Sequence, residues 1–263
     1  MSLESQIADL VSAANSLTST VAGKMSEIDQ KVNEAVETIP NEIISVMGAT
    51  YYVDQDNGSD SASGASESDP LKSFSEVGGR TPAGASVQIR LLSDYVFAEG
   101  ERAVFDSADV FIRSFPDSGQ FKIFFTAQLR EISGGVRHDC GNIYVLRNCN
   151  LNFYYVDIVF PSELDSQAFY GAQSAIIGSH SGAEIGNPLT IRFRNVDFDI
   201  PDPSNNQFCI TPGYGLVILS TQNVTAPAAW VDRGMMLRQY PSTDMIIKAG
   251  LIHDDDALIA DNT

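Results

Sequence analysis

The spacing between apolar residues changes once along this 263-residue chain, and that change limits the fold more than any other feature. Up to residue 47 the apolar residues recur at helical intervals. From Ser86 onward they alternate with polar residues, as they do in strands. Residues 1–47 also contain no aromatic side chain and one glycine. The sequence therefore predicts a helical N-terminal part followed by a mainly β body.

The helical part carries a heptad repeat. Its apolar residues are spaced alternately four and three apart, which places them on one narrow stripe of a helix. A second consecutive step of four, from Val21 to Met25, inserts a stutter into the repeat. The predicted oligomerisation seam consists of Leu3, Ile7, Leu10, Leu17, Val21, Met25, Ile28, Val32 and Ile39, with Ala14 and Ala35 in the same register.

Two explanations account for this stripe: the helix packs on its own body, or it associates with copies of itself. The flanks are polar or charged, and an isolated helix of this kind is marginally stable, so self-association explains the stripe better. Leucine at d with β-branched residues at a favours two strands, whereas Ile28 at d favours three or more. The residues alone leave dimer and trimer open. Pro40 is expected to interrupt the helix and to begin a second short one that ends at Gly48.

The body is expected to contain many short strands separated by Gly, Pro, Asn and Ser. Apolar residues alternate with polar ones at 87–91, 110–112 and 121–125. This pattern is typical of an all-β architecture. Three cysteines, Cys140, Cys149 and Cys209, are too few and too scattered for a disulfide framework or a zinc site, so we expect buried thiols.

A weak internal repeat lies within the body. "IYVLRNCNLNF" (143–153) and "TIRFRNVDFDI" (190–200) align without a gap, and in each the apolar phase slips by one residue at an asparagine. The slip is harmless if Asn148 and Asn195 adopt a left-handed backbone at a bend. A fainter third copy surrounds Asn223.

Copies 47 residues apart suit two rungs of a solenoid at about 23 residues each. That is the geometry of a right-handed parallel β-helix. An ordinary β-sandwich with a chance match is the alternative, because so few copies are present.

Charge and hydropathy exclude some classes of protein. Acidic residues outnumber basic ones 34 to 16, for a net charge of −18, and no Lys/Arg cluster offers a nucleic-acid surface. No basic start precedes an apolar block, so no signal peptide is expected. No apolar run approaches the length of about 18–20 residues that a membrane span needs, so we expect no membrane insertion.

The segment "YYVDQDNGSDSASGASESDPLKSFSEV" resembles the start of the β-helix in pectate-lyase-like proteins. In those proteins a strand ending in Val-Asp leads through an Asn-Gly-Ser-Asp loop to a short helix that caps the solenoid. The matching residues are Tyr52, Val53, Asp54, Asn57, Gly58, Ser59, Asp60, Gly64, Pro70, Leu71, Lys72, Ser73 and Phe74. "PAGASVQIRLLSDYVF" (82–97) then looks like a first rung.

A coiled coil placed before such a segment resembles bacteriophage tail fibres and tailspikes, and the first residues are similar to the start of many tail-fibre proteins. The resemblance implies a homotrimer in the virion, synthesised in the host cytoplasm. Its N-terminal region would attach to phage tail or baseplate proteins, and its distal body would bind a host surface glycan or protein. The expected divisions are a stalk (1–48), a loop and capping segment (49–80), a β-helix-like body (81–250) and an acidic tail (251–263).

Some proteins in that family cleave surface glycans with a pair of carboxylates. The candidates here with strand-like surroundings are Asp157, Glu163, Asp165, Asp197 and Asp199. Asp197 and Asp199 are predicted to point away from the core. They carry the alternative of a tailspike glycan depolymerase, whereas a noncatalytic tail fibre is the main expectation. A purely structural tail appendage is a third possibility.

No metal or cofactor is expected. "DQDNGSD" fails as an EF-hand, because placing Gly58 sixth puts Val53 and Gln55 where carboxylates belong. Aromatic residues near the distal end are candidates for receptor binding. They are Tyr214, Trp230 and Tyr240.

Overall fold

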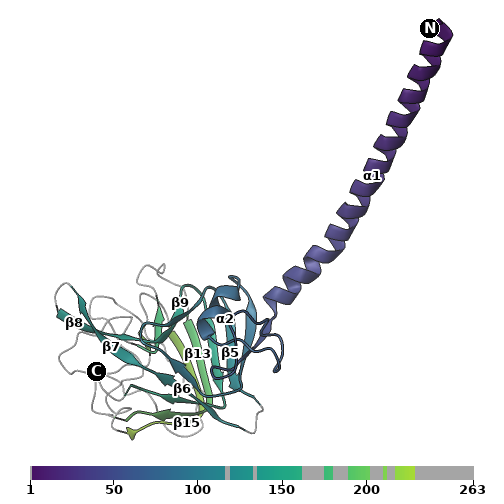
Figure 1. Cartoon of the computed structure of the whole chain (residues 1–263). Helices are drawn as coiled ribbons and strands as arrows, with labels where there is room; N and C mark the ends of the chain where they lie inside the picture. The colour runs from purple at the N-terminus through teal and green to yellow at the C-terminus, as the bar shows by residue number, and fades with distance from the viewer. Residues whose placement is uncertain are drawn as a thin grey trace. The chain divides into compact units, whose positions relative to one another are not determined.

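The computed structural model divides the chain into two compact units, Met1–Val46 and Met47–Thr263. It describes residues 2–115, 119–132, 135–161, 175–179, 189–201, 210–211 and 217–228. The division falls two residues before Gly48, where the stalk was predicted to end. The first unit is helical, and the second is mainly β with a large parallel sheet curled into a half-barrel (Figure 1).

The first unit consists of one helix, α1 (Leu3–Met47). The predicted interruption at Pro40 was wrong, because the helix continues through this residue. Proline lacks an amide hydrogen and crowds the preceding turn, which weakens or bends a helix without having to end it.

Three groups of parallel strands build the described part of the second unit. Sheet A contains β1 (Thr50–Val53), β2 (Ser86–Leu91), β5 (Asp109–Ser114), β10 (Asn150–Tyr154), the first half of β13 (Leu189–Asp199) and β15 (Val217–Thr225). Sheet B contains β3 (Tyr95–Phe97), β6 (Phe121–Phe125), β11 (Val156–Val159) and the second half of β13. Sheet C contains β4 (Arg102–Phe105), β9 (Asn142–Val145), β12 (Ile177–Ser179) and β14 (Ile210–Thr211).

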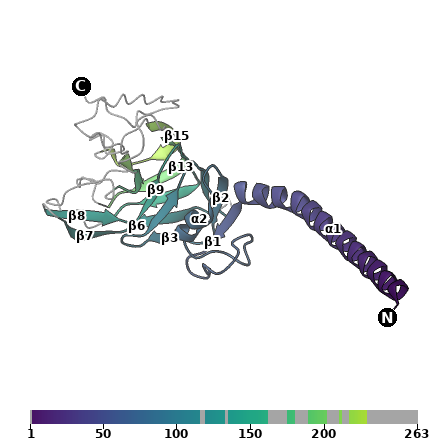
Figure 2. The same ribbon diagram turned by 90° about the horizontal axis from the view of Figure 1, so that it is seen from above.

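One antiparallel hairpin is inserted among these parallel strands. It pairs β7 (Ala127–Ile132) with β8 (Gly135–Cys140). Figure 1 and Figure 2 both show it reaching beyond the parallel strands. The sequence did not indicate this hairpin.

The strand register corrects the predicted repeat. Ser86 of β2 pairs with Asp109 of β5, 23 positions later, which equals half of the predicted 47-residue repeat to within one residue. Asp109 pairs with Asn150, 41 positions later, because the hairpin lies between them. Leu151 then pairs with Ile191, 40 positions later and not 47.

The 47-residue alignment therefore superposed different parts of the fold. Strand β9, in its first copy, belongs to sheet C, whereas the first half of β13 belongs to sheet A. Asn148 lies between sheets C and A, and Asn195 lies between sheets A and B. The two bends need the same backbone conformation, so their local sequences look alike although they occupy different corners.

The predicted left-handed bends are confirmed. The φ angles are 29° at Asn148, 53° at Asn195 and 52° at Asn223. Asn223 Nδ2 donates to Asn195 Oδ1 at 2.9 Å, which joins the bends of β13 and β15. Tyr155, with φ 54°, occupies the same corner one strand earlier, and its amide donates to the Arg194 carbonyl at 3.1 Å.

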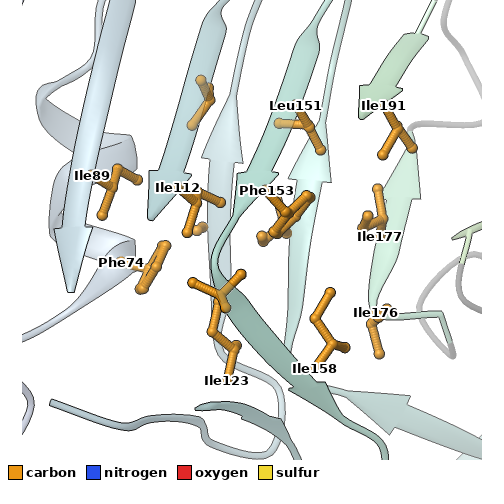
Figure 3. Packing of buried hydrophobic residues seen from close by; sticks show 14 of the residues in the cluster. Phe74, Ile89, Ile112, Ile123, Leu151, Phe153, Ile158, Ile176, Ile177 and Ile191 are labelled. Atoms are coloured by element: carbon orange, nitrogen blue, oxygen red, sulfur yellow. The ribbon is translucent and has the colours of Figure 1, made fainter. Parts of the chain in front are cut away.

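The core lies between the sheets, where inward side chains stack in rows (Figure 3). Ile89, Ile112, Phe153 and Phe193 occupy one register row of sheet A and are at most 1% exposed. The rings of Phe153 and Phe193 stack at a centroid distance of 5.1 Å. Cys140 and Cys149 are buried as predicted, whereas Cys209 lies outside the described residues.

The predicted capping segment forms α2 (Phe74–Arg80). Ser73 caps this helix by accepting a hydrogen bond from the Glu76 amide at 3.1 Å. Phe74 is buried and packs edge-on against Tyr95 at a centroid distance of 4.6 Å. The helix therefore covers one part of the apolar core.

The polar loop before α2 is held by its own hydrogen bonds. Asp60 Oδ1 accepts from the amides of Lys72 and Ser73 at 3.1 and 2.9 Å. Arg80 donates to the Asp60 carbonyl at 2.8 Å. The loop is an ordered turn structure, in which the Asp60 carboxylate accepts hydrogen bonds from backbone amides.

Candidate functional site

The apolar stripe of α1 is the most prominent candidate site. Its nine predicted seam residues are all exposed in the single chain, from 48% at Val21 to 73% at Leu3. Val11 and Val36, both at e positions, are 53% and 66% exposed and widen the stripe. These two residues were not predicted from the sequence, because they lie outside the a and d positions of the heptad.

The stripe can bury its apolar side chains only by packing against another apolar surface. Each large apolar side chain that moves from water into a packed environment contributes about 1.5–3 kcal/mol. Beside the stripe, Lys24 and Lys31 pair with Glu27 at 2.6 and 3.1 Å. The Lys24 and Lys31 ammonium groups hold the pKa of Glu27 below its ordinary value. These charged side chains remain in water. Burial against a partner would therefore stabilise the apolar stripe and not the charged flank.

The second candidate site is a group of carboxylates on the outward surface of sheet B. Asp197 and Asp199 are exposed, as predicted. Ile158 pairs with Phe198, so Asp157 lies beside Asp197 on the neighbouring strand. Parallel strands are about 4.8 Å apart, so these two side chains are close neighbours.

The environment of Asp157 differs from that of an isolated surface carboxylate. Partial burial raises its pKa, and the charge of Asp197 adds to that increase. The Gln120 amide donates to Asp157 and acts in the opposite direction. The structure thus places Asp157 beside Asp197, whereas the pair predicted from the sequence is Asp197 and Asp199, on one strand.

A third group, which the sequence analysis missed, lies on the outward surface of sheet A. Arg90, Arg113, Arg192 and Arg194 all occupy outward positions of its strands. The Arg90 guanidinium carbon lies 4.9 Å from the ring centroid of Phe115 and 5.5 Å from that of Tyr52. Only the strand register brings these side chains together, because they are spread over 105 positions of the sequence.

Several predicted residues lie outside the described part of the chain. They are the receptor candidates Tyr214, Trp230 and Tyr240 and the carboxylates Glu163 and Asp165.

Among the described residues, no three His, Cys, Asp or Glu side chains are grouped so that they could hold a metal ion. No described helix has both the length and the apolar character to span a membrane. Comparison with protein-family models, curated proteins and solved structures finds no match to this chain.

Proposed function

We propose that this chain is a noncatalytic phage tail fibre, a trimeric structural protein of the virion that supports attachment to the host surface. The observation that carries the proposal is the exposed heptad stripe along the 45-residue helix α1, followed by a parallel β body. The resemblance of the segment from Tyr51 to Val77 to the start of β-helix proteins adds support, since it forms a strand, a loop and a capping helix here.

We propose further that the body is a parallel β-helix. Strands of sheets A, B and C recur in that order along the chain, and every pair within these sheets is parallel. Each circuit adds one strand to each sheet and one layer to the core. A β-sandwich would instead be built from antiparallel neighbours.

The trimer is favoured by Ile28 at a d position and by the resemblance to tail fibres. In this assembly the stripes of three α1 helices bury one another. The N-terminal region binds a tail or baseplate protein, and the body contacts a glycan or protein of the host surface.

Two measurements on the phage that encodes this chain test the proposal. Antibodies against the purified full chain should label the tail in electron micrographs of intact virions. The purified chain should also bind host cells and reduce phage adsorption in competition. Absence of the chain from purified virions would overturn the proposal. If the chain is present in the virion but neither binds host cells nor competes with phage adsorption, the purely structural appendage is the remaining explanation.

The depolymerase alternative rests on one observation, the neighbouring carboxylates Asp157 and Asp197 with the raised pKa of Asp157. A retaining glycosidase holds its two carboxyl groups about 5 Å apart. Release of reducing ends from host polysaccharide, lost in both Asp157→Asn and Asp197→Asn, would favour this enzyme. Activity that survives both changes would exclude this pair.

A further inference from the structure

The outward surface of sheet A, here called the arginine face, has a charge opposite to that of the whole protein. Its charged residues in the described strands are Arg90, Arg113, Arg192, Arg194 and Asp109. They give a net charge of +3 on a chain with a net charge of −18. Four of the 16 basic residues of the chain therefore gather on one side of one sheet.

This face also has the composition of a buried interface. Arg90 stacks on Phe115, and Phe111 and Tyr154 stack with ring centroids 6.3 Å apart. Arginine and aromatic residues are enriched where proteins meet. Arg90 and Arg113 are also direct register neighbours, and like charges in that position repel each other. A negatively charged surface packed on this face would relieve the repulsion.

The outward surface of sheet B, here called the aspartate face, is such a surface. It carries Asp157, Asp197, Asp199 and Lys122, and Asp94 immediately precedes its first strand. Together they give a net charge of −3. Asp94 Oδ1 accepts from the Lys122 amide at 2.8 Å, which ties Asp94 to the strands of this face.

The two faces cannot meet within one chain. The backbone bends between sheets A and B at Tyr155, Asn195 and Asn223, so the two outward surfaces point in different directions. They can meet between two copies of the chain. A two-fold contact of one face with itself would oppose like charges, whereas a head-to-tail contact opposes +3 with −3.

We infer that the arginine face of each chain packs against the aspartate face of the next, so that three such contacts close the trimer around the body. Head-to-tail contacts form a ring when the rotation closes, and a three-stranded α1 coil supplies that rotation. In the proposed contact, β13 of one chain meets β13 of the next. Arg192 and Arg194 then face Asp197 and Asp199 of the neighbouring chain. This inference rests on the proposed trimer.

The test is a charge swap in the full chain. Arg192→Glu/Arg194→Glu reverses one side of the contact, Asp197→Lys/Asp199→Lys reverses the other, and the quadruple variant reverses both. In the trimer each double variant should lower the thermal midpoint of the body by at least about 2–4 °C, which is the shift that a loss of about 1 kcal/mol causes in a domain of this size. The quadruple variant should recover more than half of the summed loss, because opposite charges face each other again.

The matched control repeats the swap in Leu10→Asp/Leu17→Asp chains, in which the α1 stripe is disrupted. If the contact lies between chains, the quadruple variant should not recover its thermal midpoint in these monomeric Leu10→Asp/Leu17→Asp chains. Additive losses in the trimer, or equal recovery in the monomer, would overturn the inference.

Sedimentation of each variant separates this inference from the proposed function. A wild-type monomer would contradict the proposed trimer itself, whereas a trimer with additive losses contradicts only the contact between the two faces. Loss of heparin binding in the Arg192→Glu/Arg194→Glu trimer without a change in midpoint would assign the arginine face to an anionic polysaccharide and would also overturn the inference.

Discussion

Helix α1 and the β body differ in where they keep their apolar side chains. The seam residues of α1 are about half to three quarters exposed, whereas Ile112 and Phe153 of the body are at most 1% exposed. The body builds its core from its own three sheets, since each parallel strand adds a layer to the same rows. The helix has no comparable core of its own.

This difference in exposure indicates that the body is stabilised by folding within one chain and α1 by association between chains. The body gains hydrophobic stabilisation by folding, within one chain. A single helix gains little, because most helical stability in proteins comes from packing an apolar face against something else. The fold of α1 should therefore depend on association, and that of the body much less so.

The largest expected effect comes from placing charge in the stripe. Leu10→Asp/Leu17→Asp should abolish self-association, because a packed seam cannot hold two desolvated carboxylates per chain. The helical part of the far-ultraviolet circular dichroism should then fall, while the β signal persists. Ser12→Asp/Ser19→Asp adds the same charges at f positions and should change neither. Equal losses in both variants would contradict the role of the stripe.

The next largest effect is expected from a substitution in the core of the body, where the apolar side chains are already buried within one chain. Phe153→Ala should lower the free energy of unfolding of the body by about 3–5 kcal/mol, because it leaves a cavity in a stacked row. Chemical denaturation followed by near-ultraviolet circular dichroism measures this loss. Asn150→Ala, at an exposed position of the same strand, serves as the control. A loss no larger than that of the control would contradict the assigned core.

A smaller effect is expected in the loop before α2. Gly64 has φ +72°, and a Cβ there would lie 2.7 Å from Leu71 Cγ. Gly64→Ala should cost about 1–3 kcal/mol through backbone strain and crowding. Gly79→Ala, where a Cβ meets nothing within 4 Å, should be neutral or stabilising by up to about 1 kcal/mol. Thermal unfolding of both variants measures the difference, and equal midpoints would show that the loop tolerates a side chain.

The smallest effect concerns Asp54. Partial burial acts to raise the pKa of Asp54, but hydrogen bonds from Asn57, Ser93 and Asp56 outweigh it and hold the pKa below its ordinary value of 3.8. A lowered pKa in the folded state stabilises the fold above pH 3.8, and this contribution is lost as the pH falls through the folded pKa.

Asp54→Asn should therefore lower the free energy of unfolding at pH 7 by less than about 1 kcal/mol, because this group is largely solvated, and the thermal midpoint should fall with it. The gap to the wild type should narrow as the pH falls below 3.8. Midpoints measured from pH 7 to pH 3 test this, and a gap that widens in acid would refute the assignment.

The features that could be predicted from the sequence were local. The strand from Tyr51, the capping helix at Phe74 and the left-handed bends at Asn148, Asn195 and Asn223 each follow from a few adjacent residues. The helix break at Pro40 was also a local prediction, and it was wrong because one missing hydrogen bond does not end a long helix.

The features that could not be predicted depend on register between distant strands. The predicted 47-residue repeat treated the bends at Asn148 and Asn195 as equivalent. Their local sequences are alike and do not show which two sheets each bend joins. The pairing of Asp157 with Asp197 and the arginine face arise only when strands 23 to 41 positions apart become neighbours. Outward positions also carry no fixed apolar pattern that would mark them in advance.

Sedimentation equilibrium of the purified full chain at neutral pH measures how many chains the α1 stripe joins. We expect a trimer of about 85 kDa, three times the chain mass of 28.4 kDa. A dimer would retain the seam but contradict the trimer. A species of 28.4 kDa throughout the concentration range would show that the chains do not associate, because the exposed stripe of α1 would then have no partner chain.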